Sequence, residues 1–407
     1  MGEARPRVLL IATQDTKQEE TRFVRRILEE AGIRVIHLDP SVRQSLGGAE
    51  ISPEEVARAA GTTIEAVRSL GHEGKCHDLM VTGALARALE THARAPLAGV
   101  FAIGGSMGTG LATAVMRALP YGLPKLMVST MASGFTRPYV GVKDIAMLHA
   151  VTDISGLNSI SRDVLRNGAL AMAGMAKGYR GPRSSRQPLV LATTLGTTEA
   201  SVRRIRKALE ADGAEVMVFH SSGAGGTALD SIAAERDVAL VLELSVTEIV
   251  DELFGGIAAA GPERGMAALR RGIPTILAPG NADFVIGGPL EVAAAQFPGR
   301  RYHVHSPALT AVRTQLAELK RIAEKLADMA AQARGPVEFL VPLRGFSRND
   351  GPDGHLHDPS LPGPFADHLE QALAGRAPLT RVDAHFNDPD FSDAVLARAR
   401  KLMGAPA

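Results

Sequence analysis

Short apolar runs alternate with amphipathic helical patterns along the chain. In the first half, residues 8–12, 34–38, 97–103 and 126–129 are apolar runs of strand length. Between the first two, residues 16–31 place Phe23, Val24, Ile27 and Leu28 on one helical stripe, which Gly32 ends. Strands that alternate with helices in this way predict a parallel sheet with helices on both faces.

The same pattern begins again 181 positions later. At that offset the matching pairs are Thr13 and Thr194, Arg22 and Arg203, Arg25 and Arg206, Leu28 and Leu209, Glu29 and Glu210, and Gly32 and Gly213. We therefore predict an α/β fold of two Rossmann-like parallel-sheet domains, related by internal duplication and facing each other across a cleft. The polar stretch 180–188 predicts a linker, which gives a nucleotide-binding domain at 1–182 and a second domain at 183–407.

The last quarter of the chain has a different pattern. Residues 310–333 read as one long helix, residues 337–343 as a strand, and residues 344–364 as a long loop rich in Gly, Pro, Asp and His. The apolar stripe of 310–333 and the Ala-rich helix at 292–296 offer more apolar surface than two sheets need. We expect a homo-oligomer, a dimer or a tetramer.

Composition narrows the classes of protein. The 407 residues carry a net charge of +1, which does not suit a polyanion binder, and 4% aromatics without Trp do not suit single-stranded nucleic acid. Cys76 is the only cysteine, which fits a reducing, cytoplasmic compartment. With no signal-peptide pattern at the start and no apolar run near the ~18 residues of a membrane helix, we expect no membrane partner.

The clearest candidate site is a glycine-rich stretch after the strand at 99–103. It contains Gly104, Gly105, Ser106, Gly108 and Thr109, and we expect the following helix to begin near Leu111. Glycines allow a close backbone approach, and the free N–H groups of a helix start favour an anion. The stretch lacks the Gly-Lys-Ser/Thr of a Walker loop. The alternative is a tight turn without a ligand.

Two other first-half loops also follow predicted strands, where ligands of open α/β sheets bind. One contains Thr13, Asp15, Thr16 and Lys17; Lys17 could meet a phosphate, and Asp15 could hold Mg²⁺ or a ribose hydroxyl, unless the loop only caps a helix with Glu19. The other loop contributes Ser129, Thr130, Ser133 and Gly134 as possible phosphate or base contacts. Asp144 and Asp153 follow it and are candidate Mg²⁺ ligands.

The second half offers a weaker set of substrate candidates after its own strands. They are Ser222, Gly225 and Gly226 in a second possible anion-binding loop, Asn281 and Asp283 after the strand at 274–278, and His305, while Glu248 is a catalytic candidate. For each of these taken singly, ordinary loop geometry is the better explanation. His303 and His305 alternate along a strand, but no His-Glu-x-x-His accompanies them, so a transition-metal site is not expected. Cys76 is expected to be structural.

Taken together, these motifs resemble the Tm-1-like ATP-binding family, an otherwise uncharacterised family, over nearly the whole chain. The resemblance rests on Asp15-Thr16-Lys17 with Glu20, Gly104-Gly105-Ser106 with Gly108-Thr109, Ser129-Thr130 with Ala132-Ser133-Gly134, Tyr139-Val140-Gly141 with Asp144-Ile145, Asp153-Ile154 with Gly156-Leu157-Asn158, Gly225-Gly226, Glu248, Gly255-Gly256, Gly272-Ile273-Pro274 and Arg313-Thr314. It implies two Rossmann-like subdomains, with ATP bound by the first. The chain departs from the family pattern at Glu243, where an Asp is expected, and at Ser306, where an Asn is expected.

The leading functional hypothesis is ATP-dependent phosphoryl transfer to a small-molecule metabolite held between the domains. That chemistry needs mainly positioning and charge neutralisation. We expect Lys17, Asp15, Asp144 and Glu248 to form its catalytic set, with ATP and Mg²⁺ as cofactors. One alternative is a nucleotide-binding regulatory or interaction protein without catalysis. Another is a lyase or isomerase that uses no nucleotide.

Overall fold

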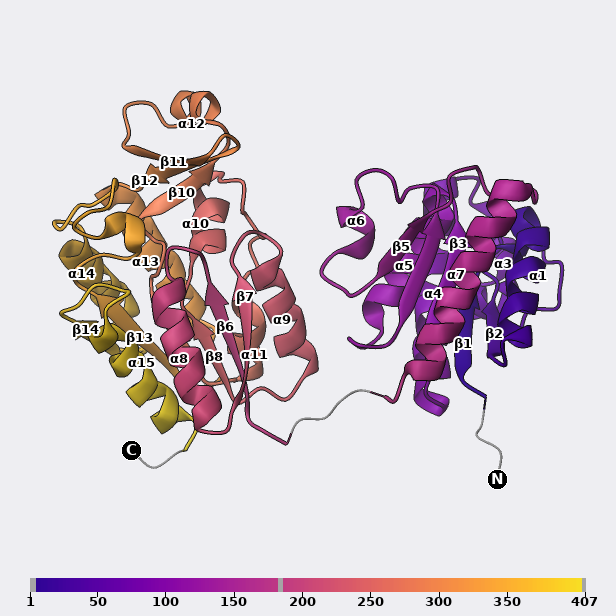
Figure 1. The fold of residues 1–407 in the computed structure, drawn as a ribbon, viewed down its shortest axis with the longest axis horizontal. Helices are drawn as coiled ribbons and strands as arrows, with labels where there is room; N and C mark the ends of the chain where they lie inside the picture. Colours follow the sequence, from indigo (N-terminus) through magenta and orange to yellow (C-terminus); the bar gives the residue numbers. More distant parts are fainter. Residues whose placement is uncertain (1–4, 182–185, 405–407) are drawn as a thin grey trace. The chain divides into compact units, whose positions relative to one another are not determined.

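The structure, a computed structural model, describes residues 5–181 and 186–404, which form two compact units (Figure 1). The predicted domain boundary at residues 182 and 183 lies outside the described residues. Each unit holds its own parallel sheet and its own apolar core.

The first unit contains a five-stranded sheet in the order β2-β1-β3-β4-β5. All of its paired strands are parallel: β1 (Arg7–Ile11), β2 (Arg34–Leu38), β3 (Gly99–Gly104), β4 (Lys125–Ser129) and β5 (Ala146–His149). The four strand runs that the sequence predicts are all present. Strands β2 and β3 lie on opposite sides of β1, so the strand order reverses its direction between β1 and β3. Such a topological switch point, at the carboxyl ends of the strands, is where open α/β sheets bind ligands.

Helices cover both faces of this sheet, as the alternating pattern predicts. The cores place α1 (Gln14–Glu30) and α7 (Ser159–Gly178) on one face, and α2 (Pro53–Ala59), α3 (Ile64–Ser69), α4 (Glu73–Arg94) and α5 (Ser106–Ala118) on the other. The short α6 (Arg137–Val140) lies between β4 and β5. Helix α5 begins at Ser106, five residues before the predicted start at Leu111, because the glycine stretch itself forms the first helical turn.

The second unit repeats this arrangement. Its six-stranded sheet has the order β14-β13-β9-β8-β6-β7, all parallel, with β6 (Leu189–Thr194), β7 (Glu215–His220), β8 (Leu240–Glu243), β9 (Thr275–Leu277), β13 (Val337–Pro342) and β14 (Leu379–Val382). The positions of β7, β6, β8 and β9 correspond to those of β2, β1, β3 and β4. The strand order therefore supports the internal duplication that the 181-residue offset predicts.

Helices α8 (Glu199–Ala211) and α15 (Pro389–Leu402) pack on one face of the second sheet. The other face carries α9 (Gly225–Glu235), α10 (Thr247–Phe254), α11 (Met266–Arg271), α13 (Leu316–Ala331) and α14 (Pro362–Leu373). A small antiparallel sheet in the order β10-β12-β11 and the helix α12 (Leu290–Gln296) are inserted before α13. Its strands are β10 (Phe284–Gly287), β11 (Tyr302–Ser306) and β12 (Leu309–Arg313), and a 3₁₀ turn lies at Arg348–Asp350.

The predicted helix at 310–333 is wrong at its start, since residues 310–313 belong to β12 and the helix begins only at Leu316. Its apolar stripe is buried inside the unit, where Leu319, Ile322 and Leu326 are at most 1% exposed and pack with α14. Of the two helices on which the oligomer prediction rests, only α12 leaves apolar side chains exposed, at Leu290 and Val292. The homo-oligomer stays a prediction. No helix among the described residues is long and apolar enough to span a membrane.

Candidate functional site

A cavity of about 550 Å³ opens at the carboxyl ends of β1, β2 and β3 in the first unit. Residues 11–17 after β1, residues 40–43 after β2 and residues 103–111 after β3 form three of its walls, and α3 and α4 contribute the rest. The cavity thus lies at the switch point of the first sheet, and its volume is in the range of small-molecule sites.

The glycine-rich turn forms one wall of this cavity through Gly105, Ser106, Met107 and Gly108. Gly105 is the N-cap of α5, and no side chain caps the helix there. The first intrahelical hydrogen bond runs from the Thr109 N–H to the Gly105 carbonyl at 2.8 Å, so the N–H groups of the three residues before Thr109 have no acceptor within the helix. These groups and the helix dipole make the turn an anion-binding position.

Gly105 leaves space at this turn. Its φ is −81°, so the absence of a side chain is not required by backbone conformation. A Cβ placed on it would meet only the Thr130 Oγ1, at 3.8 Å. The space that a side chain would fill is therefore open to a ligand.

Other residues predicted for this site are used by the fold. The buried hydroxyls of Thr109 and Ser129 lie 2.6 Å apart and hydrogen bond to each other, so a role for them in ligand binding stays a prediction. Gly104 packs against the first turn of α5, where a Cβ would come within 3.0 Å of Gly108. In the described part of the chain the cavity wall does not include Gly104, Thr130, Ser133 or Gly134.

The loop after β1 also lines the cavity, through Thr13, Asp15, Thr16 and Lys17, as predicted. The start of α1, however, is capped by its own unit. The Gln14 N–H donates to the Asp39 carboxylate at 3.1 Å, and the Asp15 N–H donates to the Ser41 Oγ at 3.1 Å. The alternative of a capping box with Glu19 is not what forms, because Thr13 is the N-cap and its side chain makes no cap hydrogen bond. The turn at α5 is therefore the better anion site.

Lys17 and Asp15 each make a contact that shapes the cavity. The Lys17 Nζ donates to the Ile154 carbonyl at 2.7 Å, and the Asp15 Oδ2 accepts the Arg43 N–H at 3.0 Å. Glu20 binds the same segment as Lys17 by accepting the Gly156 N–H at 2.6 Å. An ammonium has three donors, so Lys17 keeps the capacity to contact an anion in the cavity.

The sequence pattern did not predict the wall that residues 40–80 contribute. These residues are Pro40, Val42, Arg43, Arg68, Gly71, His72, Glu73, Cys76, His77 and Met80. They bring two guanidiniums, two imidazoles and the Glu73 carboxylate to a wall that also holds the apolar Val42, Met80 and buried Cys76. The glycines of this segment do not follow a predicted strand directly, and only the position of the segment after β2 could have signalled it.

The candidate magnesium ligands Asp144 and Asp153 lie apart in the structure, and magnesium binding by either stays a prediction. Asp144 precedes β5 at the amino edge of the sheet, where its carboxylate accepts the Lys125 Nζ at 2.9 Å and the Gly122 N–H at 2.8 Å. Asp153 follows β5 at the carboxyl edge and caps the Ile154 N–H. The two carboxylates lie at opposite ends of one strand and cannot share an ion, and Asp144 does not reach the cavity. Across the described ranges no group of three or more His, Cys, Asp and Glu side chains is arranged to hold a metal.

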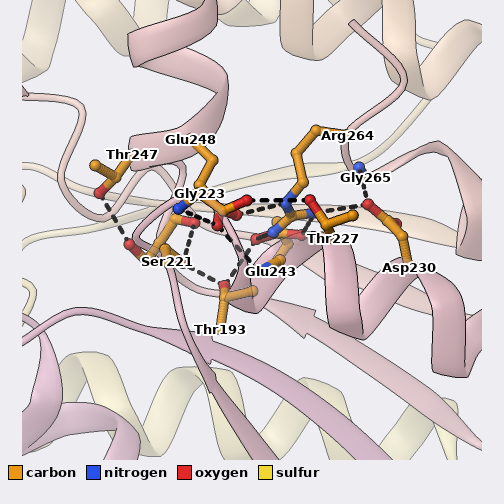
Figure 2. A network of polar contacts seen from close by, with 12 residues as sticks. Thr193, Ser221, Gly223, Thr227, Asp230, Glu243, Thr247, Glu248, Arg264 and Gly265 are labelled. Carbon is orange, nitrogen blue, oxygen red and sulfur yellow. Dashed lines mark hydrogen bonds and ion pairs between the residues drawn. The ribbon is translucent and has the colours of Figure 1, made fainter. Parts of the chain in front are cut away.

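The second-half glycine loop does bind an anion, but the anion belongs to the chain itself. The Glu248 Oε1 accepts the N–H groups of Gly223 and Gly226 at 2.8 and 3.0 Å (Figure 2). Gly226 is therefore not free to bind a substrate. A side chain at Gly225 would place its Cβ 1.9 Å from the His220 carbonyl, so Gly225 serves the fold.

Glu248 is also not available as a catalytic group, because it is buried in an ionic cluster around Arg264. The Arg264 Nε donates to Glu248 at 2.6 Å, its Nη1 and Nη2 donate to both oxygens of Glu243 at 2.9 and 2.8 Å, and Asp230 lies at 3.5 Å (Figure 2). Although burial by itself lowers the pKa of Arg264, the three carboxylates raise it above its ordinary value. The cluster is a structural feature of the second unit.

The remaining second-half candidates divide between buried and exposed positions. Asn281 is buried, with its Oδ1 accepting the hydroxyls of Ser245 and Thr198. Asp283 is also buried and accepts the Ser347 Oγ at 2.7 Å. Both side chains are held by hydrogen bonds inside the second unit, and their assignment to a substrate stays a prediction. Ser222 and His305 are exposed, and a role for them stays a prediction.

One buried carboxyl of the second unit gives a prediction for pH. Asp251 accepts the Ile286 and Ala258 N–H groups at 2.9 and 2.8 Å, and burial raises its pKa to about 7 against these two hydrogen bonds. From about pH 4 to pH 7 the unfolded carboxyl is ionised while the folded one holds its proton, so this group lowers the free energy of unfolding as pH rises, at up to about 1.4 kcal/mol per pH unit.

We expect Asp251→Asn to remove this dependence. Urea unfolding at pH 5 and pH 7 should show the parent losing about 2 kcal/mol more than the variant over that interval. Asp237→Asn, at an exposed position, should behave as the parent does. Parallel pH profiles for the parent and Asp251→Asn would contradict the assignment.

The fold and the cavity define a two-unit α/β protein with a duplicated parallel sheet and a switch-point cavity in the first unit. Models of an uncharacterised protein family, UPF0261, match both units: the N-terminal domain at residues 6–181 and the C-terminal domain at residues 187–403. The chain belongs to this family.

Relatives match over nearly the whole chain. A UPF0261 protein of Clostridium tetani is 35% identical over 98% of both chains, and one of Rhizobium meliloti is 36% identical over 97% of this chain and 99% of that one. The tomato (Solanum lycopersicum) ToMV resistance protein Tm-1(GCR237) is 30% identical over 96% of this chain and 55% of its own length. The resemblance to Tm-1-like proteins is therefore confirmed.

Similarity to solved structures is distant. A putative UDP-N-acetylglucosamine 2-epimerase from Listeria monocytogenes shares 14% identity at a TM-score of 0.22, covering 67% of this chain and 79% of that one. MurG of Acinetobacter baumannii shares 12% identity at a TM-score of 0.23, covering 97% and 99%. Scores this low carry no argument about the present chain.

Proposed function

We propose that the first unit is a nucleotide-binding module that takes ATP in the switch-point cavity. The observation that carries the proposal is the uncapped first turn of α5, whose N–H groups border the cavity beside Gly105. A polyphosphate at that turn would be bound by the backbone of Ser106 to Gly108 and by the helix dipole. The volume of about 550 Å³ suits a nucleotide-sized ligand.

The rest of the wall has the chemistry for the other parts of a nucleotide. Lys17, Arg43 and Arg68 supply positive charge for the phosphates. Val42, Met80 and Leu111 supply an apolar surface for a base. ATP bound here would bring a transferable phosphoryl group. The predicted catalytic set is not assembled around the cavity, since Asp144 lies at the opposite edge of the sheet and Glu248 is buried in the Arg264 cluster. The geometry therefore supports nucleotide binding better than phosphoryl transfer.

Titration calorimetry of the full chain with ATP, ADP, AMP and inorganic phosphate tests the proposal. We expect saturable binding of one nucleotide per chain, tighter for ATP and ADP than for AMP, because the added phosphates engage the α5 turn and the cations. A chain that is not stabilised by any nucleotide in thermal unfolding, and that releases no heat with one, would refute the proposal.

Ser106→Ala should weaken ATP binding without abolishing it. The side chain of Ser106 lines the cavity, but the backbone N–H groups of the turn remain in the variant. The expected loss is about 0.5–3 kcal/mol, the range for one neutral or charge-assisted hydrogen bond. Ser159→Ala, at the start of α7 in the same unit, is the matched control and should bind as the parent does. Equal affinities for Ser106→Ala and the parent would exclude a contact from the hydroxyl.

A further inference from the structure

A second cavity, of about 310 Å³, lies in the second unit at the carboxyl ends of β6 and the edge strand β7. Its wall consists of Thr194, Leu195, Gly196, Glu199, Val202, Arg203, Arg206, Val218 and His220. Two guanidiniums and one imidazole thus face a space that contains a single acidic side chain, Glu199. All of these residues belong to the second unit, so this cavity is independent of the proposed nucleotide site.

The first unit shows what occupies the corresponding place in the other copy of the duplication. There, Glu50 lies beside the edge strand β2 and is bound by Arg25 through Nη1 and Nη2, at 3.1 and 2.6 Å. The same carboxylate accepts the His37 N–H of β2 at 2.8 Å. An arginine fork and an edge-strand N–H therefore hold one carboxylate, an arrangement that is specific for planar oxyanions.

The second unit keeps both donors. At the 181-residue offset Arg206 corresponds to Arg25 and Val218 to His37, and both line the cavity. The N–H groups of Glu215 and Ser221 point toward β6, because they donate to the carbonyls of Pro188 and Thr194. Because N–H groups alternate in direction along a strand, the Val218 N–H points away from β6, as the His37 N–H points away from β1.

The carboxylate is what the second unit lacks. In the described part of the second unit, the acidic contact of Arg206 is Glu210, 3.9 Å from its Nε, whereas the corresponding pair in the first unit, Arg25 and Glu29, is at 2.8 Å. Arg203 has no ion pair within the described ranges and adds a second positive charge to the wall. The position that Glu50 fills in one copy is open in the other.

We propose that this cavity is a binding site for a small organic acid, whose carboxylate takes the place of Glu50 between Arg206 and the Val218 N–H. Arg203 and His220 favour a second acidic or polar group on the same ligand. The volume is at the lower end for small-molecule sites and fits a compact metabolite. The second unit thereby has an anion site of its own, distinct from the glycine loop that Glu248 occupies.

The test uses the full chain with acetate, succinate and citrate as probes, and with succinamide as the neutral control. Titration followed by NMR or calorimetry should show saturable binding of at least one acid and none of succinamide. Arg206→Gln should weaken that binding about tenfold or more, and Arg206→Lys should fall between it and the parent, because lysine keeps the charge but not the fork. Arg204→Gln is the matched control. Arg204 is the neighbouring arginine, pairs with Asp393 at 2.9 Å and does not line this cavity, so its variant should bind as the parent does.

Two results would overturn the proposal: no saturable binding of any of the three acids, or unchanged binding of the acids in a folded Arg206→Gln variant. Circular dichroism melts of each variant establish that the protein is folded. Because Arg206 is partly exposed and its one ion pair is long, we expect these melts to match that of the parent.

Discussion

Gly105→Val is expected to abolish ATP binding while leaving the chain folded. Gly105 borders the cavity at the start of α5, and a branched side chain there would occupy the space beside the N–H groups that we assign to the phosphates. The backbone tolerates the change, because φ is −81° and a Cβ would meet only the Thr130 Oγ1, at 3.8 Å. Calorimetry with ATP and a thermal melt of the same sample measure the two properties separately.

The matched control is Gly174→Val. Gly174 lies in α7 of the same unit and is exposed, and a Cβ added to it would have no neighbouring atom within 4 Å. Both substitutions place valine where glycine has no packing role, but only one of them faces the cavity. ATP binding that survives in Gly105→Val as it does in Gly174→Val would show that the nucleotide does not use the α5 turn.

Arg264→Met is expected to destabilise the second unit by about 3–5 kcal/mol, the range for removing one partner of a buried ion pair. The substitution leaves Glu243 and Glu248, which are 2% and 1% exposed, without their cation, and Asp230 beside them. Urea unfolding of the parent and the variant measures the loss. ATP binding should be unchanged under native conditions, since every residue of the nucleotide cavity lies in the first unit.

Arg270→Gln is the control for charge removal on the same part of the chain. Arg270 pairs with Glu263 at the surface, where such pairs contribute about 0–1 kcal/mol. A loss for Arg264→Met no larger than that for Arg270→Gln would mean that the buried carboxylates do not depend on the guanidinium.

The fold was largely predictable because the pattern of apolar runs is repeated. The strand at residues 34–38 is found at those bounds, and the duplicated strand order follows from the 181-residue offset. The prediction failed at residues 310–313, where a β-strand runs directly into the helix that begins at Leu316. The apolar positions alone do not show where the strand ends and the helix begins, because both elements bury their apolar side chains.

The candidate site was predictable only where a glycine or a strand end marks it. Gly105 and Lys17 were found by their positions after β3 and β1. Glu248 was misassigned because local sequence does not show that a carboxylate from α10 fills the Ser221–Thr227 loop. Asp144 was misassigned because the residue precedes its strand, which places it at the wrong edge of the sheet. Arg68 and His72 were missed because they lie in α3 and at the start of α4, where no strand end marks them.

A crystal structure of the full chain grown with ATP is the most direct test of the central claim, that the first unit binds a nucleotide at the α5 turn. We predict one nucleotide per chain, with phosphate oxygens within hydrogen-bond distance of the N–H groups of Ser106 to Gly108 and the base against Val42, Met80 and Leu111. A nucleotide at the Ser221–Thr227 loop of the second unit, or a first-unit cavity without nucleotide at saturating ATP, would contradict it.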